Sequence, residues 1–200
     1  MRMTDTIGVL VVCDGCSSGA HSEIGAALGA AWTAELVVSC GGDVELAITR
    51  LIERLSRVVR GSAEPRLFVR EHMLFTLIVA VITPLSVRVY GRGDGIVCIN
   101  GERTVRDSGV ENAPDYLSYA LVNGTCPSQV DMWAEAATHD VDFLAIGTDG
   151  AVDANELLLS AASEPVFARN ASWLQRQLWA HEQSLIDDTA IVLLRRKEGA

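Results

Sequence analysis

The sequence lacks the features that would assign it to several large classes of protein. Its longest apolar run, residues 73–81, is about half as long as a membrane-spanning helix. Near the N-terminus, no basic region precedes an apolar segment with a cleavage site, so no secretory signal is visible. Basic charge is scarce, because 16 Lys and Arg stand against 26 Asp and Glu and the net charge is −10. We therefore expect a cytoplasmic protein with no nucleic-acid or membrane partner.

The cysteines do not form a recognisable disulfide or metal framework. Their number, five, is odd and their spacing is irregular, although Cys13 and Cys16 have the spacing of a redox or zinc pair. A zinc site needs a second pair or nearby histidines, and neither follows. A redox pair begins at a helix start, whereas Cys13 continues the apolar run 7–12. Cys13 is therefore interpreted as a small buried residue in a reduced protein that has no cysteine nucleophile.

The apolar content that is present suffices for one full core. With 49% hydrophobic residues in a chain of 200, a single domain spanning residues 1–200 is the expected organisation. No linker or internal repeat divides it. The four tryptophans are expected in the core.

Periodicity predicts helices near both ends and strands in the middle. Strands are predicted over 7–13, 96–100, 130–137, 141–146 and 189–194, with a hairpin formed by 74–82 and 85–90. Helices are predicted over 23–35 with Ser22 as N-cap, over 44–60 capped by Asp43, and over 115–122, 153–160 and 172–185. The remainder of 103–124 is interpreted as loop, and 195–198 as a solvated tail. This order predicts a layered α+β domain with two largely antiparallel sheets.

Three acidic motifs, each at the end of an apolar run, are the main functional signal. They are VCDG at 12–15, GTDG at 147–150 and DDTA at 187–190. Glycine after a strand-end carboxylate lets the chain turn sharply and brings a backbone carbonyl close to a ligand. One Asp-Gly pair is usually only a turn, but three carboxylates from distant segments are what a pair of hard divalent cations needs. The motifs therefore predict a metal site.

In their order along the chain, these segments resemble the metal-dependent protein phosphatases of type 2C, the PPM-type phosphatases. The segments that carry the resemblance are 12–15 with Gly19 and Glu23, the glycine-rich turn 91–95, the strand and turn 144–153, and the closing motif 187–192. They span nearly the whole chain, and the loop 14–23 most resembles a divergent bacterial branch of the family.

The resemblance implies a four-layer α-β-β-α sandwich with metal ions in the cleft between its sheets. Asp14 would bridge two Mg²⁺ or Mn²⁺ ions, with the carbonyl of Gly15 on one of them. Asp149 and Asp187 would complete the second site, and Asp153 matches the position that holds a weaker third ion. The implied catalytic residues are thus Asp14, Asp149 and Asp187. The implied reaction is hydrolysis of phosphoserine or phosphothreonine by a metal-activated water, with a phosphoprotein and its Ser/Thr kinase as partners.

The chain departs from the family pattern at its start. The family opens with an acidic motif on a strand ahead of the first Asp-Gly strand, and an upstream arginine binds phosphate. Only residues 1–6 precede the first predicted strand, and Asp5 is their sole acid. Either the start of the sequence is truncated, or this protein lacks one metal ligand and one strand of the sheet. Asp5 is an alternative source of the carboxylate, and Arg92 or Arg103 are speculative substitutes for the arginine. The alternative function is a weak or inactive pseudophosphatase that binds a phosphoprotein or a kinase. A hydrolase of a small phosphoester is a third possibility.

Other polar residues near the motifs have simpler interpretations. Asp94 is expected to form a turn rather than to bind metal, and Asp187 is favoured over Asp188 as the closing ligand. His21 is expected to face solvent, with a role as an acid near the cleft as the alternative. Residues 112–116 form either a flap over the cleft or a plain surface loop.

Overall fold

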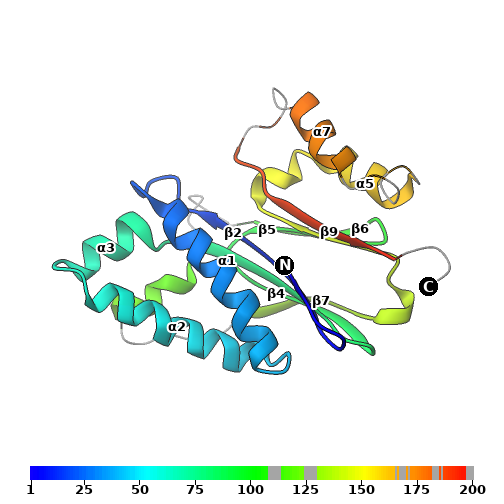
Figure 1. Ribbon diagram of the computed structural model, residues 1–200. Coiled ribbons are helices and arrows are strands. Elements are labelled where there is room, and N and C mark those ends of the chain that lie inside the picture. The colour runs from blue at the N-terminus through cyan, green and yellow to red at the C-terminus, as the bar shows by residue number, and fades with distance from the viewer. Residues whose placement is uncertain are drawn as a thin grey trace.

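Two antiparallel sheets pack face to face, and helices cover their outer faces (Figure 1). The computed structural model describes residues 1–107, 114–123, 130–164, 166, 170, 172–181, 185 and 187–196. This is the α+β sandwich that the sequence predicts. None of the helices in these ranges combines the length and apolar character needed to cross a membrane.

The first sheet has five strands in the order β1-β2-β3-β4-β7. They are β1 (Arg2–Met3), β2 (Gly8–Gly15), β3 (Phe75–Ile82), β4 (Ser86–Arg92) and β7 (Asp131–Ala137). The predicted hairpin is confirmed as β3 and β4, and β3 is buried on both faces as its continuous apolar run indicates. A two-residue strand, β1, precedes β2 where the sequence predicted no strand of ordinary length.

The second sheet has four strands in the order β6-β5-β8-β9. They are β5 (Gly95–Ile99), β6 (Glu102–Arg106), β8 (Phe143–Gly147) and β9 (Ile191–Arg195). Asn100 and Gly101 make the tight turn into β6 with φ angles of 51° and 92°, as such a pair favours. The prediction of loop over the region of β6 was wrong. As an edge strand with mostly exposed polar side chains, β6 carries no apolar alternation to reveal it.

Helices cover the outer face of each sheet (Figure 1). Over the first sheet lie α1 (Ser22–Ser39), α2 (Val44–Arg60), α3 (Pro65–His72), the short 3₁₀ helix η1 (Leu117–Tyr119) and α4 (Ala120–Asn123). Over the second lie α5 (Asn155–Ser163) and α7 (Ser172–Ala180). Two further 3₁₀ turns, η2 (Thr138–Asp140) and η3 (Asp149–Val152), flank β8. A separate apolar layer that includes Leu10, Ile78 and Ile146 fills the space between the sheets.

The helices agree with their sequence signals except at one cap, at one short segment and at the end of α7, which stops at Ala180 although helix is predicted to residue 185. Asp43 caps α2 as predicted, with its Oδ1 accepting from the Leu46 N–H at 3.0 Å. Ser22 is not a cap, because it is the first residue of α1 and its hydroxyl donates to the Cys16 carbonyl at 2.8 Å. The helix α3 was missed, since it has two turns and Val69 is its one buried residue.

The two arginines at the end of β9 make structural contacts rather than form a solvated tail. Arg195 belongs to β9, and its guanidinium donates to the carbonyls of Ala161 and Glu164 at 3.1 and 2.9 Å. Arg196 pairs with the Asp142 carboxylate at 3.1 Å. The predicted tail therefore anchors the end of the second sheet as far as residue 196.

Among the tryptophans, Trp133 is buried as expected. Trp179 is not, because 67% of its surface is exposed near the end of α7.

Candidate metal centre

The three acidic motifs meet at one end of the sandwich, although they come from both sheets. Asp14 lies near the end of β2, in the same alternating row as Leu10 and Val12, which pack between the sheets. Side chains two apart on a strand share a face, so Asp14 also projects between the sheets. In the other sheet, β8 ends where β9 begins, with Gly147 opposite Ile191. The Asp-Gly turn after β8 and the acids before β9 therefore lie side by side.

A pocket of about 240 Å³ gathers these groups. Six of its described lining residues are acids, and none of the described lining residues is Lys, Arg or His. The acids are Asp14, Glu23, Asp94, Asp149, Asp187 and Asp188. The Gly15 backbone, Thr76, Pro114 and Tyr116 complete much of the wall. Such an excess of negative charge in a partly enclosed space favours the binding of cations.

Hydrogen bonds between strands fix the two Asp motifs of the second sheet. The Thr148 N–H donates to the Ala190 carbonyl at 3.0 Å, and the Ala190 N–H donates to the Thr148 hydroxyl at 3.1 Å. These bonds join the turn that carries Asp149 to the segment that carries Asp187.

Glycine is required at position 150 because the turn after β8 packs closely against the segment before β9. A Cβ atom at this position would lie 2.5 Å from the Asp188 carbonyl oxygen and 3.0 Å from that of Asp187. The glycine of the GTDG motif therefore serves the packing of two chain segments, and it holds their carboxylates near one another.

Burial and the nearby carboxylates make the Asp14 side chain harder to ionise. Burial, followed by the negative charges of Asp149 and Asp187, raises the pKa of Asp14 from 3.8 to about 7. The Asp14 and Asp149 side chains are also in hydrogen-bond contact, which two carboxylates make when they share a proton. A divalent cation between them would replace that proton and relieve the repulsion. The oxygen donors present thus fit a hard cation such as Mg²⁺ or Mn²⁺.

Most of the predicted metal ligands line the pocket, but Asp153 does not. Asp14, Gly15, Asp149 and Asp187 line it, and Asp188 lines it as well. Asp153 is exposed at the end of η3 and is not among the lining residues. Across the described ranges, no three His, Cys, Asp or Glu side chains are arranged as a preformed metal-ligand group. The assignment of these residues as ligands stays a prediction.

Asp94 was interpreted as a turn residue only, and the structure adds a second property. Its flanking residues Gly93 and Gly95 have φ angles of 96° and 137°, which confirms the turn. Its side chain is nevertheless buried, with 4% of the residue exposed, and it lines the pocket. The sequence signal was ambiguous because glycines on both sides explain the turn without any role for the carboxylate.

Cys13 and Cys16 occupy different environments and do not form a disulfide. Both are free thiols, and burial raises the pKa of Cys13, which faces the helix side of the first sheet. Cys16 lines the pocket, with its sulfur 3.1 Å from the Ser18 hydroxyl. Burial opposes ionisation of Cys16, but hydrogen bonds with Ser18 and Tyr116 outweigh it and lower the pKa.

His21 and the two arginines lie outside the pocket wall, whereas part of the segment 112–116 lines it. His21 is exposed and stacks on His72 with ring centroids 5.6 Å apart. Arg92 forms an ion pair with Asp115, and Arg103 is exposed on β6. Neither arginine is among the residues that line the pocket. Of the predicted flap 112–116, residues 112 and 113 lie outside the described residues, while Pro114 and Tyr116 are pocket residues.

Comparison with known proteins agrees with the fold and the motifs. The family model for protein phosphatase 2C matches residues 2–187, so the chain belongs to the protein phosphatase 2C family. Members of this family are phosphoprotein phosphatases, which are hydrolases, and they depend on Mg²⁺ or Mn²⁺. A search of curated proteins finds no match.

Solved structures show the same architecture at low sequence identity. The serine/threonine phosphatase Stp1 from Staphylococcus aureus has a TM-score of 0.61 and 15% identity, with 96% of this chain and 84% of that chain covered. The Mycobacterium tuberculosis serine/threonine phosphatase PstP/Ppp has a TM-score of 0.58 and 14% identity, with coverages of 96% and 88%. RsbX in complex with magnesium has a TM-score of 0.55 and 19% identity, with coverages of 96% and 83%. At these identities, the likeness shows the shared fold.

Proposed function

We propose that this chain is a metal-dependent serine/threonine protein phosphatase whose residues 1–200 act as one domain. The observation that carries the proposal is the convergence of Asp14, Asp149 and Asp187 in one acidic pocket between the sheets. The family match supports the reaction class. The phosphoprotein substrate, its Ser/Thr kinase and a cytoplasmic location follow as parts of the same proposal.

Asp14, the Gly15 carbonyl, Asp149 and Asp187 are the groups that we expect to hold two Mg²⁺ or Mn²⁺ ions, with Asp153 near a third. When bound, such ions supply the positive charge that ionises water and offsets the charge of the phosphoryl oxygens. The protein's own contribution is to hold the carboxylates in place. The Asp14 N–H donates to the Thr76 hydroxyl at 3.3 Å, and the packing at Gly150 holds the other two acids.

The pocket also limits how a substrate can bind. Its six carboxylates repel a phosphate group, so phosphate binding depends on bound cations. Its volume of about 240 Å³ lies below the roughly 300–1,000 Å³ of clefts that enclose a whole small ligand. These properties favour a phosphorylated side chain that enters while the rest of the substrate stays outside.

One observation favours the alternative of a weakly active or inactive binding protein. The strand β1, which precedes the first Asp-Gly strand, consists of Arg2 and Met3 and carries no carboxylate. Asp5 is exposed and is not among the lining residues of the pocket. The opening acid of the family motif therefore has no counterpart in the described pocket.

Hydrolysis of an aryl phosphate and of a phosphothreonine peptide, with Mn²⁺ and with chelator, separates the two functions. Asp149→Asn is the test variant. Asp140→Asn is the matched control, because Asp140 is an exposed acid in η2, before β8 rather than after it. We expect metal-dependent turnover that is lost in D149N and kept in D140N. Folded wild-type protein without turnover in Mn²⁺ would contradict the enzyme and leave the binding role.

A further inference from the structure

The strand β9 is an edge strand whose backbone is open on one side. In the described part of the chain it pairs only with β8, in antiparallel register. The Thr148 N–H donates to the Ala190 carbonyl, and the Arg196 N–H donates to the Asp142 carbonyl. Hydrogen-bonded residues alternate along an antiparallel strand, so residues 190, 192, 194 and 196 face β8. The N–H and C=O groups of Ile191, Leu193 and Arg195 therefore point away from β8, and no described strand pairs with them.

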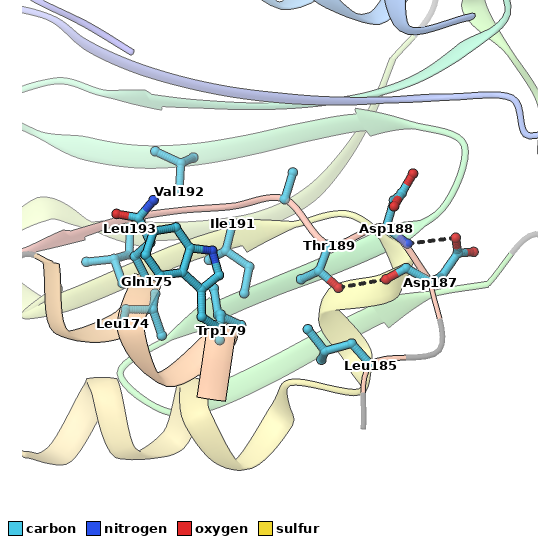
Figure 2. A pocket seen from close by; sticks show the side chains of 12 residues that line it. Leu174, Gln175, Trp179, Leu185, Asp187, Asp188, Thr189, Ile191, Val192 and Leu193 are labelled. Carbon is cyan, nitrogen blue, oxygen red and sulfur yellow. Dashed lines mark hydrogen bonds between the residues drawn. The ribbon is translucent and has the colours of Figure 1, made fainter. Parts of the chain in front are cut away.

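A groove of about 930 Å³ runs along this open edge between β9 and α7 (Figure 2). Ile191 and Leu193 pack under the helices of the second sheet, whereas Val192 packs between the sheets, yet all three line the groove. A cavity that touches side chains from both faces of a strand lies along its edge. The volume is within the range of roughly 300–1,000 Å³ that ligand clefts have.

The wall opposite β9 belongs to α7 and is mostly apolar. Leu174 and Trp179 lie on it beside the polar Gln175 (Figure 2), and Leu178 lines it as well. Trp179 is 67% exposed. An open strand edge can accept an extended peptide as an added strand, with main-chain hydrogen bonds for affinity and side-chain pockets for specificity.

The groove adjoins the acidic pocket. Asp187 and Asp188 line both, at the point where the chain enters β9 (Figure 2). A substrate segment in the groove would thus lead directly to the candidate metal centre.

We propose that an extended segment of the phosphoprotein substrate pairs with β9 as an added strand, while its phosphorylated side chain enters the acidic pocket. The inference rests on the proposed phosphatase function and specifies its substrate class: peptides with strand-forming, alternating apolar residues beside the phosphorylated one. The open backbone groups of Ile191 and Leu193 hold the segment, and α7 contacts its apolar side chains. Because Asp188 precedes Ile191 by three positions, the phosphorylated residue lies about three residues from the one that pairs with Ile191.

Phosphothreonine peptides that carry a short segment of alternating valine and threonine test this proposal. The segment is placed before the phosphothreonine in one peptide and after it in another, and glycine and serine replace it in a control. A fourth peptide has N-methyl groups on alternate backbone nitrogens, which removes donors without changing the side chains. We expect one placement to lower KM about tenfold relative to the control, and N-methylation to abolish the gain, because about two hydrogen bonds are lost.

Binding of the unphosphorylated segment peptides is measured separately by calorimetry and does not require turnover. We expect N-methylation to weaken this binding about tenfold and Trp179→Ala to weaken it as well. Leu85→Ala is the matched control, since Leu85 is an 83% exposed apolar residue in the turn between β3 and β4. We expect it to leave binding unchanged.

The outcomes separate this inference from the proposed function. Turnover of the aryl phosphate and of all peptides with equal KM, with no effect of N-methylation, overturns strand addition and leaves the phosphatase. Methylation-sensitive binding without turnover of any substrate supports the groove and overturns the phosphatase. Absence of both overturns both.

Discussion

Replacing Asp14 with asparagine should stabilise the metal-free protein while abolishing its activity. Burial and the neighbouring charges of Asp149 and Asp187 raise the Asp14 pKa from 3.8 to about 7. The folded state therefore holds this proton more tightly than the unfolded state does, and ionisation above pH 7 destabilises the fold. Asparagine keeps the size of the side chain and removes the charge. The proposed metal-binding role of Asp14 thus opposes its contribution to stability until a cation is bound.

The magnitude and the pH window follow from that shift. One pKa unit corresponds to about 1.4 kcal/mol, so a shift from 3.8 to about 7 gives an upper bound of about 4 kcal/mol. Asp14 is only half-buried, and solvent screening reduces the expected gain to about 1–2 kcal/mol. The destabilisation of the wild type is absent below pH 4, grows between pH 4 and 7, and is complete above pH 7. The gain in the variant should follow the same course.

Urea unfolding in chelator at pH 4.5, 6 and 8, for wild type and D14N, measures this difference. The control is D140N, which removes the charge of an exposed acid outside the pocket. Equal stabilities of D14N and wild type at pH 8 would refute the electrostatic argument, as would a gain that is the same at pH 4.5. Addition of Mn²⁺ should raise the stability of the wild type by more than that of D14N, because a ligand that binds only the folded state stabilises it.

Two further predictions test the packing of the site. Gly150→Ala places a Cβ 2.5 Å from the Asp188 carbonyl oxygen, so it should lower the stability of the fold by about 1–3 kcal/mol and reduce activity. Urea unfolding and the phosphatase assay measure the two effects. Gly61→Ala is the control and should have neither effect, because Gly61 has an ordinary φ of −75°. Cys16 lines the pocket and has a lowered pKa, whereas burial raises the pKa of Cys13, so Cys16 should react with maleimide well before Cys13. Mass-spectrometric mapping of the labelled native protein shows the order of reaction. Equal rates would contradict the environments assigned to the two thiols.

The elements predicted best from sequence are those whose local signal and packing agree. The strands β2 and β3 contain apolar runs rich in β-branched residues, and α2 has both an amphipathic pattern and an Asp43 cap. The strand β6 and the helix α3 were missed because each buries little, so neither has an apolar pattern strong enough to identify it.

The site residues that the sequence predicted are those in which a carboxylate and a backbone signal, glycine at a strand end, occur in one motif. Asp14 and Asp149 are each followed by glycine at the end of an apolar strand, and both line the pocket. Asp94 and Tyr116 reach the same pocket only through long-range packing, which no local pattern records. Trp179 was placed in the core on its residue type, whereas α7 leaves it exposed at the side of an edge strand.

The acidic pocket takes its carboxylates from both sheets, so metal binding should couple the stability of the two sheets. Asp14 belongs to the first sheet, whereas Asp149 follows β8 and Asp187 precedes β9 of the second, and an apolar layer fills the space between the sheets. Ions shared by these carboxylates would therefore act as cross-links between the two halves of the sandwich. Amide hydrogen exchange in β2 and β8 should then slow together when metal binds, although the two strands are not paired. Substitutions that loosen the inter-sheet layer, as at Ile146, would correspondingly weaken metal binding before they unfold the chain.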